Sequence, residues 1–417
     1  MLIFIIYYLI SPFIFILLLI TSFFNKKIKL IIKHQSKTLY ALKNNLNTQK
    51  EKIIIHAASA GEFEQIKPIL RTIDKEKFFL ITTCMSSTIF NNIQKEKLID
   101  GYCYHPFDLP WSAKKFFKTI QPSIYITTRH DVWPVHLYTA KKMNIKSIII
   151  NTNLYKKSNR LKWYSKKFTK YIFNLFSLII VPTKRIQNLF NKELKINTTH
   201  LIADTRFEQV MYRKEKSSKI FELDSISDKN NMIFGSIASP DLKIISDLIK
   251  KEIINQIEHI IIVPHEIDKL LIKNIKTLID KTKYSLIKLS DLKNNEIIKN
   301  KFILIDQIGI LPELYGYAKC AYVGGGFGKG VHSTIEPLIY QNITLYGPNI
   351  DLLDEAKEMN EKKCGFIFDN TDQAYQIIDD AFNDDDFIIQ TKINIKKYIN
   401  EKGQSALKLC KLINSHV

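Results

Sequence analysis

A glutamate stands where a short apolar run gives way to an amphipathic segment. Residues 53–70 read IIIHAASAGEFEQIKPIL, and Glu62 follows directly after Gly61. A carboxylate in the first turn of a helix offsets the positive end of the helix dipole, which stabilises the helix by at most about 1 kcal/mol. The same group at the mouth of a sheet can act as a general base that removes a proton from a hydroxyl group. This stretch alone leaves both interpretations open.

A run of glycines is the second stretch whose residues could do chemistry. Residues 322–337 read YVGGGFGKGVHSTIEP, which predicts a strand that ends at Val323 and a helix over residues 332–340. Glycines let the backbone approach a ligand closely, and the amides at a helix start can hold an anion. Lys329 could then neutralise a phosphate, and Glu336 could accept hydrogen bonds from ribose hydroxyls. The spacing fits neither the dinucleotide fingerprint nor the P-loop, and a flexible turn with a solvated glutamate is the alternative.

The chain that carries these stretches alternates short apolar runs with longer segments of helical spacing, such as 62–73, 111–120 and 134–143. This alternation predicts parallel sheets covered by helices on both faces. The runs expected as strands are 52–56, 78–83, 123–128, 146–151, 178–181, 232–237, 259–263, 302–305, 319–323, 342–346 and 365–368. Two such series exceed one sheet, so we expect two doubly wound α/β domains that face a cleft. Ligands of such sheets bind beyond the carboxyl ends of the strands, which is where Glu62 falls.

The first 24 residues are apolar except for a few hydroxyl side chains and Pro12. As a helix they reach about 36 Å, enough to cross a bilayer of about 30 Å. The basic residues come after the apolar run, which excludes a cleaved signal peptide and places the following chain in the cytoplasm. Because Pro12 sits in the middle of the run, a shallow insertion is the alternative to a span. Either way, we expect the body to be tethered to a membrane from its cytoplasmic side.

The composition sets the class of partner. The formal net charge of +20, carried almost entirely by lysine, favours acidic substrates or an anionic membrane surface. The lysines are spread along the chain without a zinc-finger or aromatic RNA-binding signature, so we expect no nucleic-acid partner. The five cysteines lie far apart with no metal-site or redox spacing, as is typical of a reducing compartment. His56, His265 and His332 fall on different expected elements, which favours a site without metal.

Eight segments, in this order, resemble the bacterial 3-deoxy-D-manno-octulosonic acid (Kdo) transferases, lipopolysaccharide enzymes of the GT-B glycosyltransferase type. The segments are IHAASAGEFEQIKPIL, TTCMSSTIF, YHPFDLPWSAKKFF, RHDVWP, DTRFEQV, VPHEI, IGILPELYGYAKCAYVGGGFGKGVHSTIEP and YGP. The SAGE and GGGFGKGxHxxxEP blocks are the most specific of these, because both carry the family's spacing and neighbours. The resemblance runs from the apolar segment to the end of the chain.

The resemblance implies an inverting transfer of Kdo from CMP-Kdo to the glucosamine disaccharide of a lipid A precursor, lipid IVA, at the cell inner membrane. It implies that Glu62 is the catalytic base and that no cofactor is needed. The residues implied at the acceptor or its loop are Ser59, Gly61, Asp131, Trp133 and Arg206. The residues implied at the donor are Gly235, Ser236, His265, Gly325, Gly326, Lys329, His332 and Glu336. The expected domains are a membrane anchor (1–24), an acceptor domain (25–211), a linker (212–231) and a nucleotide-sugar domain (232–417).

One loop departs from the family pattern. The family's ETELWPN reads RHDVWPV here, so that Arg129 stands at the position of the first glutamate. The resemblance therefore assigns no role to Arg129 or His130. Two rival functions remain: a membrane-associated GT-B enzyme that uses a nucleotide diphosphate sugar, and a non-enzymatic membrane adaptor. The adaptor would account for the apolar segment and the charge but not for Glu62 together with the glycine run.

Overall fold

The computed structural model describes residues 2–217, 219–227, 230–293, 298–299 and 301–415. The chain divides into two compact units, which we treat separately. Unit 1 comprises residues 1–209 and 404–417, and unit 2 comprises residues 210–403. The first division falls inside helix α9 (Arg206–Lys216), so the expected linker begins as helix. The last helix, α17 (Ser405–Asn414), belongs to unit 1 and not to the C-terminal domain in which we expected it.

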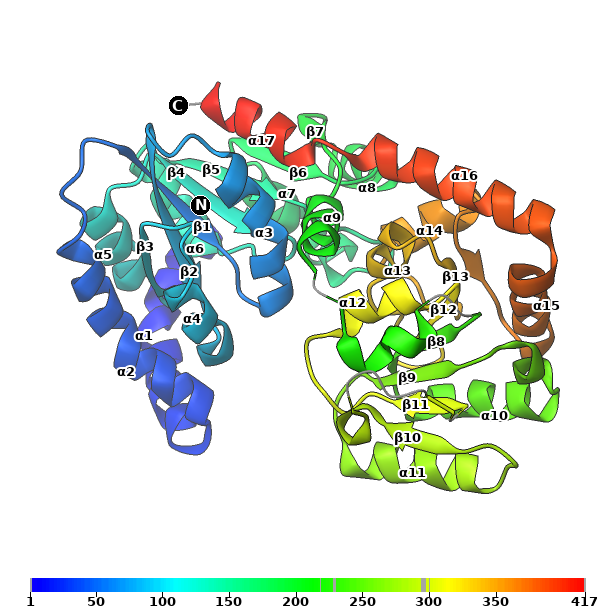
Figure 1. The fold of residues 1–417 in the computed structure, drawn as a ribbon. Coiled ribbons are helices and arrows are strands. Elements are labelled where there is room, and N and C mark those ends of the chain that lie inside the picture. Colours follow the sequence, from blue (N-terminus) through cyan, green and yellow to red (C-terminus); the bar gives the residue numbers. More distant parts are fainter. Residues whose placement is uncertain (1, 218, 228–229, 294–297, 300, 416–417) are drawn as a thin grey trace. The chain divides into compact units, whose positions relative to one another are not determined.

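Unit 1 is built on a parallel sheet with the strand order β3-β2-β1-β4-β5-β6-β7 (Figure 1). Its strands are β1 (Glu51–His56), β2 (Phe78–Cys84), β3 (Gly101–Tyr104), β4 (Ile124–Thr128), β5 (Lys146–Ile150), β6 (Leu178–Val181) and β7 (Thr199–Leu201). Its other helices are α1 (Leu2–Phe24), α2 (Lys26–Lys43), α3 (Ala60–Thr72), α4 (Ser87–Gln94), α5 (Pro110–Ile120), α6 (Pro134–Lys142), α7 (Lys166–Phe173) and α8 (Lys184–Leu189). Strand order reverses between β1 and β4, and that switch point is where such sheets bind ligands.

The two faces of this sheet bury separate apolar cores. Ile54 of β1 packs with the residues of α5, α6 and α8 on one face, whereas Ile53 and Ile55 pack with those of α3 and α17 on the other. Successive side chains of a strand point to opposite faces, so isoleucine at every position suits a strand covered on both sides. Leu409 and Ile413 of α17 complete the second core, which explains why this helix belongs to unit 1.

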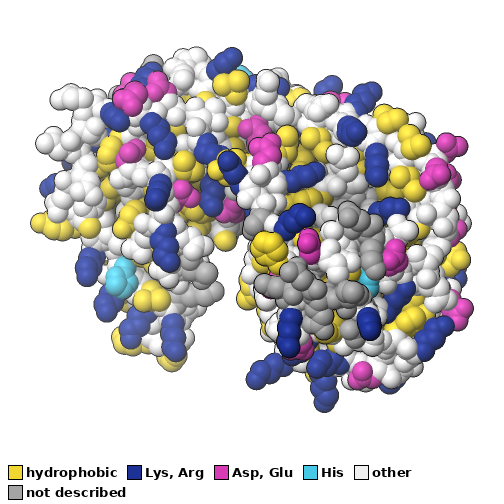
Figure 2. All heavy atoms as spheres, viewed as in Figure 1, with side chains coloured by type: hydrophobic (Ala, Val, Ile, Leu, Met, Phe, Trp, Pro, Cys, Tyr) yellow, Lys and Arg dark blue, Asp and Glu magenta, His cyan; other side chains and the backbone are white. Residues whose placement is uncertain are grey.

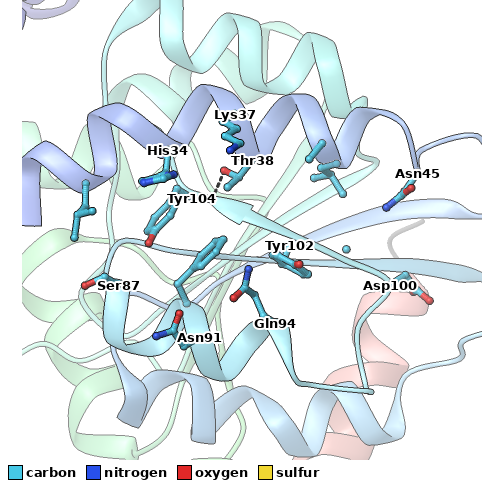
Figure 3. A pocket seen from close by; sticks show the side chains of 15 residues that line it. His34, Lys37, Thr38, Asn45, Ser87, Asn91, Gln94, Asp100, Tyr102 and Tyr104 are labelled. Atoms are coloured by element: carbon cyan, nitrogen blue, oxygen red, sulfur yellow. Dashed lines mark hydrogen bonds between the residues drawn. The ribbon is translucent and has the colours of Figure 1, made fainter.

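Helix α2 covers the outer edge of strand β3. The backbone amide of Tyr104 donates a hydrogen bond to the Thr38 hydroxyl at 3.2 Å, as Figure 3 shows. Gly101 lets the helix come this close, because a Cβ there would lie 2.5 Å from the Leu42 side chain. An exposed strand edge is a template for unwanted pairing, and α2 removes that hazard.

Unit 2 repeats the plan with the strand order β10-β11-β9-β8-β12-β13-β14. Its strands are β8 (Met232–Ile237), β9 (Ile260–Pro264), β10 (Leu286–Lys288), β11 (Phe302–Leu304), β12 (Cys320–Val323), β13 (Ile343–Tyr346) and β14 (Phe366–Ile367). Its helices include α10 (Leu242–Lys250), α11 (Lys269–Asp280), α12 (Leu311–Leu314), α13 (Ile335–Ile339), α14 (Asp354–Glu361), α15 (Thr371–Asn383) and α16 (Asp385–Lys402). The switch point of this sheet lies between β8 and β12, and the glycine run follows β12 directly.

The predicted doubly wound α/β class is confirmed in both units, and each expected strand overlaps an observed one. Three short strands, β3, β7 and β10, were not predicted. The helix expected over residues 332–340 is wrong in extent, because α13 spans only Ile335–Ile339. The amide of His332 instead donates to the Gly324 carbonyl at 3.2 Å, which ties this residue to the glycine loop. On the face drawn in Figure 2, Lys and Arg side chains are dispersed and do not form one patch.

Candidate functional site

Glu62 lies in the first turn of α3, just past the carboxyl end of β1. Ser59 is the N-cap of this helix, and its hydroxyl accepts a 3.4 Å hydrogen bond from the Glu62 amide. The carboxylate closes the capping box, because its Oε2 accepts hydrogen bonds from the amides of Ala58 at 2.8 Å and Ser59 at 3.0 Å. Within the described residues, Oε1 accepts no hydrogen bond. One oxygen therefore caps the helix and fixes the side chain, while the other can meet a ligand.

The environment makes Glu62 a stronger base than an ordinary glutamate. Partial burial raises the pKa of its carboxyl, and the two amide hydrogen bonds and the charge of Arg129 offset part of that rise. Arg129 thus acts electrostatically on Glu62 from the carboxyl end of β4. Its backbone is in the left-handed region, with φ of 49°, and its amide donates to the Ile150 carbonyl at 2.9 Å. Gly61 faces open space, since a Cβ there would meet no atom within 4 Å.

Asp131 forms a second acidic group beside Glu62. Burial, followed by the negative charge of Glu62, raises the pKa of Asp131 to about 7. Its Oδ2 lies 3.5 Å from Nε2 of the fully buried His56, and neither atom has a hydrogen-bond partner within the described residues. Burial lowers the pKa of His56 to about 3, so its imidazole is neutral. The proton that titrates near neutral pH therefore belongs to the Asp131 carboxyl and not to the His56 imidazole.

Trp133 and three histidines form an aromatic cluster under this acidic pair. The Trp133 ring lies 5.9 Å from His56 and 5.2 Å from His105 between centroids, and His105 lies 4.5 Å from His136. His105 Nδ1 donates to the Pro106 carbonyl, so its Nε2 accepts from the Tyr125 hydroxyl at 2.7 Å. Burial and the neighbouring histidines lower the pKa of His105, so this imidazole is neutral too. These ring contacts pack Trp133 of the β4–α6 loop against His56 at the end of β1.

Two arginines, Arg160 and Arg206, make polar contacts in the loops of unit 1, and Arg160 was not among the predicted site residues. Arg160 donates through Nη2 to the His130 carbonyl at 2.7 Å, while its Nη1 is buried without a partner in the described part of the chain. Its charge lowers the pKa of Asp131, opposing the effect of burial. Arg206 pairs with the Asp204 carboxylate at 2.9 Å. Burial alone would raise the pKa of Asp204, but Arg206 holds it below its usual value.

The glycine loop of unit 2 follows β12 and is tightly closed. Gly325 has φ of 90°, and a Cβ there would lie 2.3 Å from the Gly330 carbonyl oxygen. The amides of Gly328 and Gly330 both donate to the Gly325 carbonyl, at 2.9 and 3.0 Å. A Cβ on Gly326 would lie 2.6 Å from the backbone of Gly347 in the YGP segment. Glycine is therefore required sterically at positions 325 and 326.

Asp241, which sequence reasoning missed, anchors this loop. It is fully buried, and its carboxylate accepts hydrogen bonds from the Gly325 amide at 3.1 Å and the Ala238 amide at 2.7 Å. It also accepts from the Tyr322 hydroxyl at 2.5 Å. A buried charge is stable only with such partners. Asp241 therefore ties the loop after β8 to the loop after β12, across the switch point.

The predicted donor residues gather on these loops. Gly235 and Ser236 lie among the last residues of β8, before its end at Ile237. Ser236 has φ of 53°, and a Cβ on Gly235 would lie 2.4 Å from the Tyr315 hydroxyl. His265 follows β9 and stacks on His332, with 3.9 Å between ring centroids and 17° between planes. Burial and the proximity of His265 lower the pKa of His332.

Lys329 and Glu336 complete the predicted donor set. Lys329 is exposed on the loop, and Glu336 is half-buried at the start of α13. The charge of Glu336 raises the pKa of the buried Tyr315, although burial is the larger cause. Glu336 therefore lies close enough to Tyr315 for its charge to act on that hydroxyl. Among the described residues, no group of three His, Cys, Asp or Glu side chains could hold a metal ion.

A separate cavity of about 570 Å³ lies between α2, α4 and β3 (Figure 3). His34, Lys37 and Thr38 line it from α2, opposite Tyr102 and Tyr104 of β3. None of the predicted site residues lines it, so we leave it outside the candidate site.

The fold and the two switch-point sites define a class: two doubly wound units of the GT-B type. A solved glycosyltransferase from Rickettsia africae matches 88% of this chain and 98% of its own, with a TM-score of 0.59 and 14% identity. The UDP-GlcNAc 2-epimerase of Neisseria meningitidis, solved with UDP-GlcNAc, matches 87% of this chain and all of its own, with a TM-score of 0.64 and 14% identity. At such identities the likeness is one of fold.

The sequence comparisons find similarity to Kdo transferases. Residues 33–209 match the family model described as 3-deoxy-D-manno-octulosonic-acid transferase (kdotransferase). A Kdo transferase of Aquifex aeolicus is 28% identical over 338 residues, covering 79% of this chain and 85% of the relative. Residues 33–209 thus carry a Kdo transferase domain, and the predicted resemblance of the chain to Kdo transferases is confirmed.

Two further relatives are longer than the matched region. A bifunctional glycosyltransferase/methyltransferase of Fusobacterium nucleatum is 26% identical over 414 residues, which is 95% of this chain. A Kdo transferase of Rickettsia prowazekii is 26% identical over 307 residues, which is 71% of this chain. The matched region spans only 62% and 64% of these two relatives.

Proposed function

We propose that this protein transfers Kdo from CMP-Kdo to a lipid A precursor, lipid IVA, with inversion at the anomeric carbon. The similarity to Kdo transferases supports the reaction class. The observation that carries the proposal is the state of Glu62, whose Oε2 is fixed by two amides while Oε1 accepts no hydrogen bond within the described residues. A carboxylate held in this way, with a raised pKa, is suited to accept a proton.

In the proposed reaction, an acceptor hydroxyl oxygen attacks the anomeric carbon of Kdo. The new carbon–oxygen bond forms as the bond from that carbon to the phosphate oxygen of CMP breaks, and CMP leaves with the bonding electrons. Glu62 takes the hydroxyl proton. A positioned base typically contributes about 10²–10⁴-fold to such a step. Attack from the face opposite the leaving group inverts the configuration.

Unit 1 offers the remaining acceptor groups. Ser59 fixes the capping box, and Gly61 leaves open space where a sugar could approach. Asp131 and Trp133 would form the wall of this site, with Asp131 close enough to Glu62 for their charges to interact. Arg206 would act indirectly, since it is paired with Asp204.

Unit 2 offers the donor groups. The amides of Gly325 and Gly326 and the ammonium of Lys329 would hold the phosphate of CMP, whose charge grows as the bond breaks. Gly235 and Ser236 would bound the nucleotide from β8, and the stacked His265 and His332 would lie beside it. The role we propose for Glu336 is to accept hydrogen bonds from ribose hydroxyls. These residues neutralise the leaving group without a metal or other cofactor.

The acceptor would be a phosphorylated lipid of the inner leaflet, so the enzyme would work on the cytoplasmic face of the inner membrane. One described helix, α1, is long and apolar enough to cross a membrane. The excess of lysine would favour binding to the anionic surface. We propose no nucleic-acid partner.

Product analysis tests the proposal. The purified chain would be incubated with CMP-Kdo and a tetra-acylated lipid A precursor, and the lipid fraction examined by mass spectrometry. Lipid that gains one or more Kdo residues is expected. In parallel, CMP should raise the midpoint of thermal unfolding more than UDP or GDP does. Protection by UDP or GDP, with no Kdo on the lipid, would favour a GT-B enzyme that uses a nucleotide diphosphate sugar.

A further inference from the structure

The segment that follows β5, residues 155–167, lies beside the loop that carries Asp131. Strand β5 pairs with β4 up to the last residue of each strand, so both connections leave the same edge of the sheet. Arg160 joins them, because its Nη2 donates to the His130 carbonyl at 2.7 Å. His130 directly precedes Asp131, and the negative charges of Asp131 and Glu62 interact. Residues 155–167, which we call the basic segment, therefore border the acceptor side of unit 1.

Two aromatic rings project from the basic segment into solvent. Trp163 is 88% exposed and Tyr164 is 62% exposed. Their rings pack edge-to-face, with 5.8 Å between centroids and 84° between planes. Tryptophan is highly buried on average, yet among the described residues after α1 no large apolar side chain is more exposed than Trp163. An apolar surface displayed in this way indicates a ligand that covers it.

The backbone around these rings is held in a closed turn. The amides of Ser165 and Lys166 both donate to the Lys162 carbonyl, at 3.0 and 2.9 Å. Leu161, directly before this turn, packs against the apolar core of unit 1. The Trp163 ring is therefore presented from a fixed position, and a ligand that binds it does not have to order the backbone first.

The charge of the basic segment is of one sign. Its thirteen residues include six Lys and Arg and no Asp or Glu. Lys166 pairs with Glu193 at 2.7 Å, outside the segment. The exposed lysines are Lys156, Lys157, Lys162 and Lys167. Their ammonium groups can form charge-assisted hydrogen bonds with phosphate.

The apolar surface of the basic segment is aromatic and not aliphatic. Trp163 and Tyr164 are its only strongly exposed large apolar side chains within the described structure. Aliphatic chains, which would enter lipid tails readily, are missing from this exposed surface. A flat ring beside several lysines suits a ligand that combines an apolar ring face with negative charge. A phosphorylated sugar has both, because the C–H face of a pyranose ring is apolar.

We propose that the basic segment binds the phosphorylated sugar end of the acceptor, with Trp163 stacked on the C–H face of a glucosamine ring and Lys162 and Lys167 paired with its phosphate. The inference rests on the proposed function for the identity of the acceptor. One sugar of the disaccharide presents its hydroxyl to Glu62, and the other extends over the basic segment. Arg160 is a positioning residue, since it fastens the segment to the β4–α6 loop.

Binding of a soluble acceptor fragment tests the stacking contact. The ligand is an acyl-free glucosamine disaccharide that carries both phosphates, titrated into the full chain by isothermal calorimetry without donor or membrane. Trp163→Ala should weaken binding by roughly 10- to 30-fold, whereas Trp163→Phe, which keeps a ring, should stay within about threefold of the parent. The matched control is Tyr40→Ala, which removes a 69% exposed ring of α2 and should leave the affinity unchanged. Circular dichroism checks the fold of each variant.

Charge removal tests the phosphate contact. Lys162→Gln with Lys167→Gln should weaken binding roughly tenfold at low salt and much less at high salt, because salt screens exposed charges. Lys95→Gln with Lys97→Gln removes two exposed lysines elsewhere in unit 1 and should have no effect. A disaccharide without phosphates should bind the parent and the Lys162/Lys167 double variant equally. Inorganic phosphate that binds as tightly as the phosphorylated disaccharide would overturn the inference, since the sugar would then contribute nothing.

Two other results would also overturn it. The first is a parent protein that does not bind the disaccharide, or a Trp163→Ala protein that binds it equally well. The second is weaker binding of Trp163→Ala to phosphatidylglycerol vesicles with an unchanged affinity for the disaccharide, which would assign the segment to contact with the membrane.

The Kdo transfer assay separates this inference from the proposed function. Trp163→Ala should raise the KM for the lipid acceptor, while kcat and protection by CMP stay as in the parent. An unchanged KM would overturn the inference and leave the transfer reaction standing. A parent that transfers no Kdo would refute the proposed function, and calorimetry would still report whether the basic segment binds a phosphorylated sugar.

Discussion

Gly325→Ala is the sharpest test of how the glycine loop is built. The residue has φ of 90°, a conformation that costs a side-chain-bearing residue roughly 1–3 kcal/mol. Its new Cβ would also lie 2.3 Å from the Gly330 carbonyl oxygen, so the backbone must move, which typically costs about 1–3 kcal/mol. We therefore expect the loop to lose roughly 2–6 kcal/mol. The hydrogen bonds that hold it closed should then open much more often.

Gly328→Ala is the matched control in the same loop. A Cβ there would make only ordinary contacts, at 3.5 Å from Pro240 and 3.7 Å from the Gly325 carbonyl oxygen. Amide hydrogen exchange, followed by mass spectrometry on peptides that cover residues 320–350, compares the two variants. Gly325→Ala should speed exchange there by at least roughly 30-fold, since about 1.4 kcal/mol corresponds to a factor of ten. Gly328→Ala should change it less than about threefold.

Tryptophan fluorescence provides a control for effects outside unit 2. The three tryptophans, Trp111, Trp133 and Trp163, all lie in unit 1. Urea unfolding followed by tryptophan fluorescence therefore reports unit 1 and should be the same in both variants. CMP should also protect the Gly325→Ala protein against thermal unfolding less than it protects the control. Equal exchange in the two variants would refute the steric argument for the loop.

Three further predictions concern the residues around the two sites. The pKa of Asp131 is raised to about 7 in the folded protein, so its contribution favours folding at low pH and is lost as pH rises towards 7 and above. Asp131→Asn should therefore gain stability relative to the parent as pH rises from 5 to 8 in urea titrations, by up to about 2–3 kcal/mol, and a constant difference would contradict this. Asp241→Asn places an amide donor against the backbone amides of Ala238 and Gly325, which are donors themselves. The substitution should destabilise unit 2 by about 1–3 kcal/mol. Faster hydrogen exchange in the glycine loop would report this loss. The Cβ that Gly61→Ala adds would meet no atom within 4 Å, so the variant should keep or slightly raise the unfolding temperature. Its transfer activity should fall, because the Cβ enters the space where we propose that the sugar approaches. Unchanged activity would mean that no ligand approaches there.

Most strands of the two sheets were predictable because they are short, mainly apolar runs bounded by polar segments. The same alternation predicted that Glu62 and the glycine run follow strand ends. Sequence could not give the strand order, because pairing is set by contacts between distant segments. That order is what brings the loops after β1 and β4 together, and likewise those after β8 and β12. The short strand β3 (GYCY) was missed because it begins with glycine and has only four residues. Its place in the sheet becomes clear only in the structure, where α2 packs against its edge.

Long-range contacts also explain the residues that were missed. Asp241 lies 84 positions from Gly325, and nothing in the local pattern ASPD indicates that its carboxylate holds another loop. Arg160 reaches the carbonyl of His130 from a polar connection that reads as solvent-exposed. The last helix looked like part of the C-terminal domain, but Leu409 and Ile413 fill the core of unit 1. In each case the partner, and not the local sequence, determines the role.

The capping and catalytic interpretations of Glu62 are separable. Glutamine can still accept the amide hydrogen bonds of Ala58 and Ser59, so Glu62→Gln should preserve the helix cap and the unfolding temperature. Glu62→Ala should lose the cap and about 1 kcal/mol of stability as well. Glu64→Gln is the matched control, because Glu64 lies on the same helix and pairs with Lys67.

The most direct measurement is the single-turnover rate of Kdo transfer by Glu62→Gln, with CMP protection recorded on the same preparation. The account predicts a rate about 10²–10⁴-fold below that of the parent, with unchanged CMP protection and a near-normal rate for Glu64→Gln. A Glu62→Gln rate close to that of the parent would show that the carboxylate only caps the helix, and would contradict the central claim.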